Sequence, residues 1–124
     1  MPVKLKHLSR QQLGFLGERL VADALYERGF EIIGRNIHTR FGEIDVIAKK
    51  GRNVLFVEVK TRTSRRYGYP EEAITFKKRM TLSRCALALS RKFARGCHWA
   101  IVIVAVEINV AQRRASLMRI ELDG

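Results

Sequence analysis

The chain has 124 residues, of which 47% are hydrophobic, so it is long enough for one domain with a substantial core and too short for two. Its 24 Lys and Arg against 12 Asp and Glu give a net charge of +12, which favours a polyanionic partner, most often nucleic acid. There is no apolar run of about 18 residues and no apolar core of signal-peptide length at the start, so we expect a cytoplasmic protein without membrane contact. Two cysteines are too few for a disulfide framework, so we expect Cys85 and Cys97 to be reduced.

We expect a single domain over residues 1–124, in which residues 1–10 form a flexible basic arm. A helix is predicted from about Ser9 or Leu13 to Arg28, because apolar residues recur at helical spacing and Gly29 is of a type that often ends helices. Glu18 flanks the apolar stripe of this helix, beside small residues that would let another chain or a ligand approach. On helix geometry alone, an ordinary boundary glutamate in solvent is the preferred interpretation of Glu18.

Three strands are predicted next. Residues 30–37 form the first, with Gly34 as a candidate bulge. Residues 42–48 and 54–61 alternate with period two, as half-buried strands do, and residues 50–53 between them have turn chemistry. Strict alternation would place the side chains of the earlier of these two strands on opposite faces, Glu43, Asp45 and Ile47 on one and Ile44, Val46 and Ala48 on the other.

A hairpin closed across this turn would bring acidic side chains together. With Lys49 opposite Val54, Asp45 falls opposite Glu58, and Glu43 falls opposite Lys60. Two carboxylates directly across a ladder repel each other. Proteins tolerate such a pair when a cation lies between the oxygens, and hard cations are bound by oxygen ligands of this kind. The hairpin therefore predicts a metal site.

A simpler alternative is that Asp45 and Glu58 line the wet face of an antiparallel hairpin, with Lys60 as a neutralising neighbour. The metal site is favoured by the apolar surroundings, because residues 54–59 contain one polar side chain, that of Glu58. A strand this apolar is usually central, and a carboxylate on a central strand is costly unless it is paired or liganded.

Two basic segments flank this hairpin, residues 38–42 and residues 62–70, and the second combines three arginines with two tyrosines. Such segments suit phosphate contacts and base stacking, although most charged loops are solvated connectors. We expect nucleic acid to contact basic and aromatic side chains here and on the following helix, namely Arg40, Arg62, Arg65, Arg66, Tyr67 and Lys77.

That second helix is predicted over residues 76–93, with Thr75 as its N-cap. Lys77 falls on a solvent-facing row, and the inward stripe is apolar: Leu82, Cys85, Ala86, Leu89 and Phe93. Lys78 lies at the head of the inward stripe, where it either snorkels to water or points across the sheet toward the carboxylates.

Residues 99–106 are a β-branched run typical of a strand buried on both faces, and residues 116–122 predict a weaker edge strand. The order is therefore helix, three strands, helix, two strands. It predicts an α/β domain with one mixed β-sheet flanked by helices.

Three motifs, Gly42-Glu43-Ile44-Asp45, Phe56-Val57-Glu58-Val59-Lys60-Thr61-Arg62 and Glu72-Ala73-Ile74-Thr75 followed by Lys78, resemble those of the YraN-like family of bacterial proteins. The order of elements, with Asp45 and Glu58-Val59-Lys60 on adjacent strands and Glu18 on the preceding helix, also resembles the PD-(D/E)xK nuclease superfamily, which includes restriction endonucleases and archaeal Holliday junction resolvases. The resemblance extends from about Gly17 to the end of the chain and implies a restriction-endonuclease-like fold. Ile44 stands where the superfamily has a proline before the aspartate.

The resemblance also implies roles for individual residues. Asp45 and Glu58 would bind Mg²⁺ or Mn²⁺ with the backbone carbonyl of Val59, and Glu18 would complete the acidic cluster directly or through water. Lys60 would orient or help deprotonate the attacking water, and Lys78 would support the scissile phosphate or the water.

The function implied is that of a divalent-metal-dependent endonuclease acting on DNA, with branched or repair intermediates as candidate substrates. One alternative is a nucleic-acid-binding module that keeps the nuclease fold without catalysis. Another is a basic interaction protein of a larger assembly, whose carboxylates are structural. Intact Asp45, Glu58 and Lys60 favour the nuclease. A homodimer is also an option, because junction resolvases cut two symmetric strands and need two active sites.

Overall fold

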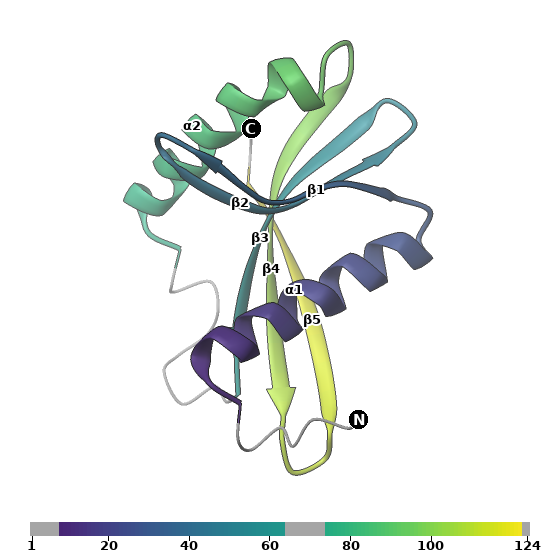
Figure 1. The fold of residues 1–124 in the computed structure, drawn as a ribbon, viewed down its shortest axis with the longest axis vertical. Coiled ribbons are helices and arrows are strands. Elements are labelled where there is room, and N and C mark those ends of the chain that lie inside the picture. The colour runs from purple at the N-terminus through teal and green to yellow at the C-terminus, as the bar shows by residue number, and fades with distance from the viewer. Residues whose placement is uncertain (1–7, 64–73, 123–124) are drawn as a thin grey trace.

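Five strands form one mixed sheet in the computed structural model, which describes residues 8–63 and 74–122 (Figure 1). The strands lie in the sheet in chain order: β1 (Glu31–Thr39), β2 (Gly42–Lys50), β3 (Asn53–Arg62), β4 (His98–Asn109) and β5 (Arg114–Leu122). All neighbours are antiparallel except β3 and β4, which run parallel and are connected through helix α2 (Phe76–Phe93). With helix α1 (Arg10–Glu27) before β1, the predicted element order and mixed sheet are confirmed.

Capping residues explain the bounds of α1. Ser9 caps α1 by accepting from the backbone N–H of Gln12 at 3.1 Å, and the Gln12 side chain accepts from the N–H of Ser9, which completes a capping box. Gly29 follows the helix with φ of +91°, a conformation that glycine adopts at little cost. The start of α1 at Arg10 places residues 9 and 10 of the predicted basic arm in the cap and the helix, and residues 1–7 lie outside the described residues.

Helix α2 has the predicted bounds and the predicted N-cap, with Thr75 Oγ1 accepting from the N–H of Lys78 at 3.1 Å. Four residues of its predicted inward stripe are buried, Phe93 at its end is partly buried, and Lys77 is exposed on the outer row. Cys85 and Cys97 are both free thiols. No helix in the described part of the chain is long and apolar enough to cross a membrane.

The two helices cover opposite faces of the sheet, and each encloses a separate apolar core. On the α1 face, Val21 and Leu25 of the helix pack against strand residues that include Val46, Ala48, Leu55 and Val57. On the α2 face, the helical residues Leu82, Cys85, Ala86 and Leu89 pack against Ile44, Ile47, Val54, Phe56, Ile101 and Ile103. The strand β4 contributes to both cores, as a strand buried on both faces must.

The hairpin of β2 and β3 has the predicted register only along part of its length. Lys49 lies opposite Val54, and Gly51 in the turn has φ of +61°. The ladder ends at the pair of Val46 with Val57, so Asp45 does not pair directly with Glu58 across it. The predicted pairing of Glu43 with Lys60 is likewise absent, because the part of β2 that precedes Val46 pairs with β1 alone.

Strand β1 is distorted twice, and the second distortion explains a wrong prediction about β2. The register shifts between Ile32 and Gly34, which confirms the predicted bulge. Asn36 then adopts φ of +49° at the position opposite Asp45, between the pairs of Arg35 with Val46 and Ile37 with Ile44. The strict alternation predicted for β2 fails at this point, because Ile44 and Ile47 pack in the α2 core whereas Val46 and Ala48 pack in the α1 core.

Beyond this bend the tip of the β1–β2 hairpin lies over α2 (Figure 1). Thr39 Oγ1 lies 3.4 Å from Cys85 Sγ, and a Cβ at Gly42 would lie 3.1 Å from Thr81 Cγ2. The bend therefore moves the first half of β2, before Val46, away from β3 and toward α2. The point at Asp45 where β2 and β3 separate is called the fork below.

The docking of α1 on the sheet gives a prediction that compares two glycines of one helix. A Cβ at Gly17 would overlap Thr61 Oγ1 and approach Thr61 Cβ to 2.9 Å, whereas a Cβ at Gly14 meets nothing within 4 Å. Gly17→Ala should therefore lower the free energy of unfolding by about 1–3 kcal/mol through overpacking. Urea denaturation measures this change.

Gly14→Ala is the matched control, because it makes the same exchange in the same helix without a clash. It should leave stability unchanged or raise it by up to about 1 kcal/mol, since alanine is the better helix former. Equal effects of the two exchanges would contradict the close packing of α1 on β3.

Candidate functional site

Glu58 is the only buried charged residue among those that the structure describes, with 7% of its surface exposed. It continues the face of β3 that carries Val54 and Phe56, so it projects toward α2. Lys78 Nζ lies 2.9 Å from Glu58 Oε1, and Lys60 Nζ lies 4.0 Å from the same oxygen. Of the two alternatives left open for Lys78, the structure supports the one in which it points across the sheet toward the carboxylates, and its ion pair compensates the burial of Glu58.

Asp45 stands at the fork where β2 leaves β3. Its Oδ2 accepts a hydrogen bond of 2.8 Å from the backbone N–H of Val59. Had the antiparallel ladder continued, this N–H would have bonded to a carbonyl of β2. The Asp45 carboxylate therefore takes the place of a strand carbonyl, and this bond holds it beside the Glu58-Val59-Lys60 segment.

The environment of Asp45 disfavours its charge. The pKa of Asp45 is raised to about 7. Burial is the largest cause, the negative charges of Glu58, Glu18 and Glu43 also raise the pKa, and the hydrogen bond from the Val59 N–H lowers it. Near neutral pH a substantial fraction of Asp45 therefore carries a proton when no cation is present. Such a raised carboxyl pKa is a common property of functional sites, although structural charge clusters also show it.

Two further carboxylates, those of Glu18 and Glu43, are hydrogen-bonded to Asn36 beside the fork. With its amide nitrogen turned toward them, as the two acceptors require, Asn36 donates to Glu18 Oε1 at 2.9 Å and to Glu43 Oε1 at 3.0 Å. Burial raises the pKa of Glu18, and so do the charges of Glu43 and Glu58, whereas Asn36 and Arg35 lower it. His38 Nδ1 lies 3.2 Å from Glu43 Oε2 on the outer side.

The structure thus brings together the predicted residues Glu18, Asp45, Glu58, Lys60 and Lys78 at one fork. Asn36 and Glu43 also lie at the fork and were not among the predicted site residues. The available signals were an asparagine within a strand pattern, a residue type that tolerates positive φ, and a second acid in the Gly42-Glu43-Ile44-Asp45 motif. Among the described residues, no three His, Cys, Asp or Glu side chains are arranged to hold one metal ion.

The residues predicted to contact nucleic acid are only partly within the described ranges. Arg65, Arg66 and Tyr67 lie outside them. Lys77 is exposed at the start of α2, and Arg40 is exposed at the hairpin tip, where its guanidinium stacks 4.7 Å from the ring centre of Phe41. Arg62 ends β3 in register with Glu107 of β4 and is engaged in contacts of its own.

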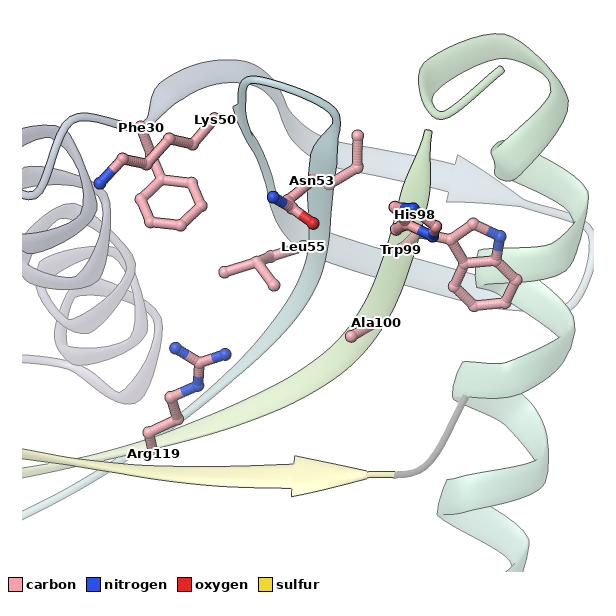
Figure 2. Close-up of a pocket in the computed structure, with 9 residues that line it drawn as sticks. Phe30, Lys50, Asn53, Leu55, His98, Trp99, Ala100 and Arg119 are labelled. Carbon is pink, nitrogen blue, oxygen red and sulfur yellow. The ribbon is translucent and has the colours of Figure 1, made fainter. Parts of the chain in front are cut away.

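A separate pocket of about 330 Å³ lies at the opposite end of β3 and contains none of the site residues (Figure 2). Figure 2 shows Phe30, Leu55 and Arg119 on the α1 side, whereas the Trp99 ring extends toward α2. Lys50 of this pocket already donates to the Arg28 carbonyl at 2.8 Å. Its side chains do not converge on a common point, so the fork remains the candidate site.

Comparison with known proteins identifies a family. The family described as "Uncharacterised protein family UPF0102" matches residues 17–110. A UPF0102 protein of Caldicellulosiruptor saccharolyticus is 41% identical over 104 residues, which cover 83% of this chain and 88% of the relative. A UPF0102 protein of Mycolicibacterium vanbaalenii is 43% identical, with 86% and 87% covered, and one of Alkaliphilus oremlandii is 34% identical, with 90% and 96% covered. The matched residues include the whole fork.

The raised pKa of Asp45 predicts how Asp45→Asn changes stability with pH. In the metal-free protein the folded state binds this proton more tightly than the unfolded chain, whose Asp pKa is about 3.9, so wild type loses stability as the pH rises from about 4 to about 7. Asp45→Asn removes that loss while keeping an acceptor for the Val59 N–H. At pH 8 without metal, the variant should be more stable by on the order of a few kcal/mol.

Urea unfolding of both proteins between pH 4 and 8 in a chelator measures this difference. Asp23→Asn is the matched control, because Asp23 lies exposed on α1, 3.9 Å from Arg19, and should change stability little at any of these pH values. A variant that is less stable than wild type at pH 8 would show that Asp45 is instead stabilised as a partner of a nearby cation.

Proposed function

The chain belongs to the uncharacterised protein family UPF0102, and we propose that it is a divalent-metal-dependent endonuclease of the PD-(D/E)xK superfamily acting on DNA. The observation that carries the proposal is the fork, where Asp45 and Glu58 lie with Lys60 and Lys78 on adjacent elements. A purely structural role explains the fork less well, because burial and the neighbouring carboxylates raise the pKa of Asp45 to about 7, which means that its charged form is destabilised there.

The donors at the fork fit a hard divalent cation. Mg²⁺ is usually bound through one or two carboxylates and keeps several waters, so a cage of three protein carboxylates is not required. Asp45 and Glu58 would supply the carboxylate oxygens, with the Val59 carbonyl beside them, and Glu18 would act directly or through water. Mn²⁺ suits the same oxygen ligands. Mutual repulsion of the carboxylates is the feature that a cation would relieve.

The residues of the chain divide the chemistry of phosphodiester hydrolysis between them. When bound, the cation would neutralise charge on the phosphate and lower the pKa of a nearby water. Lys60, half-buried beside Glu58, would donate a hydrogen bond to the attacking water and stabilise the negative charge that it develops. Lys78 neutralises Glu58 in the metal-free protein. Once Glu58 binds a cation, Lys78 would donate to an oxygen of the scissile phosphate. One P–O bond forms from water, the P–O bond to the sugar oxygen breaks, and the proton that the water loses is returned to the sugar oxygen through solvent.

The surroundings of the fork suit a polyanion. The net charge of +12 is large for 124 residues, and Arg40 and Lys77 are exposed on the hairpin tip and on α2. Contacts of this kind go to phosphates and carry little base information, so they favour binding without a strict sequence preference. Branched or repair intermediates are the proposed substrates, and a homodimer would present two such sites to two strands.

A cleavage assay tests the proposal directly. Purified protein should cut at least one of a panel of duplex, single-strand, flap and four-way-junction DNAs in Mg²⁺ or Mn²⁺, and not in a chelator. Asp45→Asn should reduce the rate by about 100-fold or more, because it removes a charge at the reacting centre. Asp23→Asn should cut like wild type.

The outcomes separate the alternatives. DNA binding without cleavage, together with no metal-induced rise in the melting temperature, would favour a binding module that keeps the fold. Neither DNA binding nor a response to metal would favour a basic interaction protein. Cleavage that persists in a chelator or in Asp45→Asn would overturn the proposed site.

The proposal also predicts how binding depends on salt. If Lys and Arg neutralise phosphates, counterion release should make log K fall linearly with log [salt], with a loss of roughly tenfold or more between about 50 and 200 mM. The combined exchange of Arg40→Ala and Lys77→Ala should reduce the slope by about one to two. Fluorescence anisotropy in a chelator measures both, and a salt-independent affinity would argue against a phosphate-binding surface.

A further inference from the structure

Asn36 has a backbone conformation that a strand residue normally avoids. Its φ is +49°, yet regular pairs with β2 flank it on both sides, Arg35 with Val46 and Ile37 with Ile44. Among the described non-glycine residues, only Arg113, in the turn before β5, also has positive φ. Left-handed backbone costs an ordinary L-residue free energy, and asparagine is among the few types that tolerate it. Such a strained residue invites the question of what its side chain does.

The Asn36 side chain links two elements that contribute acids to the fork. The same amide nitrogen donates to Glu18 Oε1 of α1 at 2.9 Å and to Glu43 Oε1 of β2 at 3.0 Å. A primary amide has two N–H groups, so it can satisfy both carboxylates at once. The left-handed turn at Asn36 therefore aims a double donor at the point where α1 faces the bend in β2.

A neutral donor suits this position better than a cation would. Glu18 and Glu43 both raise the pKa of Asp45, so they belong to the same negative field. An arginine or lysine in the place of Asn36 would bring Glu18 and Glu43 together but would cancel the field that attracts a cation. An amide brings them together and leaves their charge in place.

We propose that Asn36 is a positioning residue, which fixes the carboxylates of Glu18 and Glu43 beside Asp45 and Glu58 so that the fork is assembled before a cation arrives. Its effect on metal binding rests on the proposed function, whereas the link between α1 and β2 does not. Through this link Glu18, which helix geometry alone makes an ordinary boundary residue, becomes part of the site.

Asn36→Gly separates the side chain from the backbone, because glycine adopts positive φ freely and removes only the amide. Mn²⁺ titration followed by electron paramagnetic resonance should show affinity about 10–100-fold weaker than in wild type, as for other residues that orient ligands. Asn36→Asp should not restore it, since an ionised aspartate tolerates the same backbone but has no N–H to donate. Asn53→Ala, at the far end of β3, should bind Mn²⁺ like wild type.

A second measurement needs no metal. In a chelator, the stabilities of Asn36→Gly, Glu18→Ala and the double variant should be non-additive, because the two residues share one hydrogen bond. If wild type fails to bind Mn²⁺, the proposed function fails and this cycle still decides the link. Additive effects in the cycle, or wild-type Mn²⁺ affinity in Asn36→Gly, would overturn the positioning role.

Discussion

The hydrogen bond from the Val59 N–H to Asp45 Oδ2 determines the shape of the site. Backbone donors inside a sheet must be satisfied, and here a side chain does what a strand carbonyl would otherwise do. Because Asp45 accepts this bond, the residues of β2 that precede Val46 can separate from β3 without leaving the Val59 N–H unpaired. The same bond holds a carboxylate next to a buried glutamate, so one contact both ends the ladder and creates the electrostatic conflict at the fork.

The structure compensates its two central carboxylates by different means. Glu58 is almost fully buried and has Lys78 at 2.9 Å, a direct ion pair that offsets the loss of solvent. Asp45 is only partly buried and its hydrogen-bond donor is a neutral backbone N–H, so its negative charge is removed by protonation or would be balanced by a bound cation. Within residues 8–63 and 74–122, the fold therefore supplies Glu58 with a cation of its own and supplies Asp45 with none.

Periodicity and capping predicted the elements and the nearness of Asp45 and Glu58, and the family resemblance added Glu18 and Lys60, whereas nothing in the sequence predicted the bend in β2. The apolar stripe of α2 places Lys78 on the inner side of the helix, which left two alternatives, snorkelling to water or approach to the carboxylates, and the structure shows the second. Alternation along β2 gave the wrong face for Ile44, which precedes Asp45, because a period of two assumes a regular ladder, and the left-handed Asn36 opposite interrupts it. The link from Asn36 to Glu18 joins a strand to a helix, and no local pattern encodes such a contact.

The charge distribution gives the last step of the argument. Although the chain carries +12, four of its 12 acidic residues, Glu18, Glu43, Asp45 and Glu58, gather at one fork. A phosphodiester drawn to the basic surface would meet net repulsion there unless the fork first gained positive charge. Under the proposed function, a cation at the fork would remove that repulsion and so raise the affinity for DNA. By linkage, bound DNA would raise the affinity for the cation by the same factor. A basic surface with an acidic centre is therefore an arrangement in which the anion and the cation each favour the binding of the other.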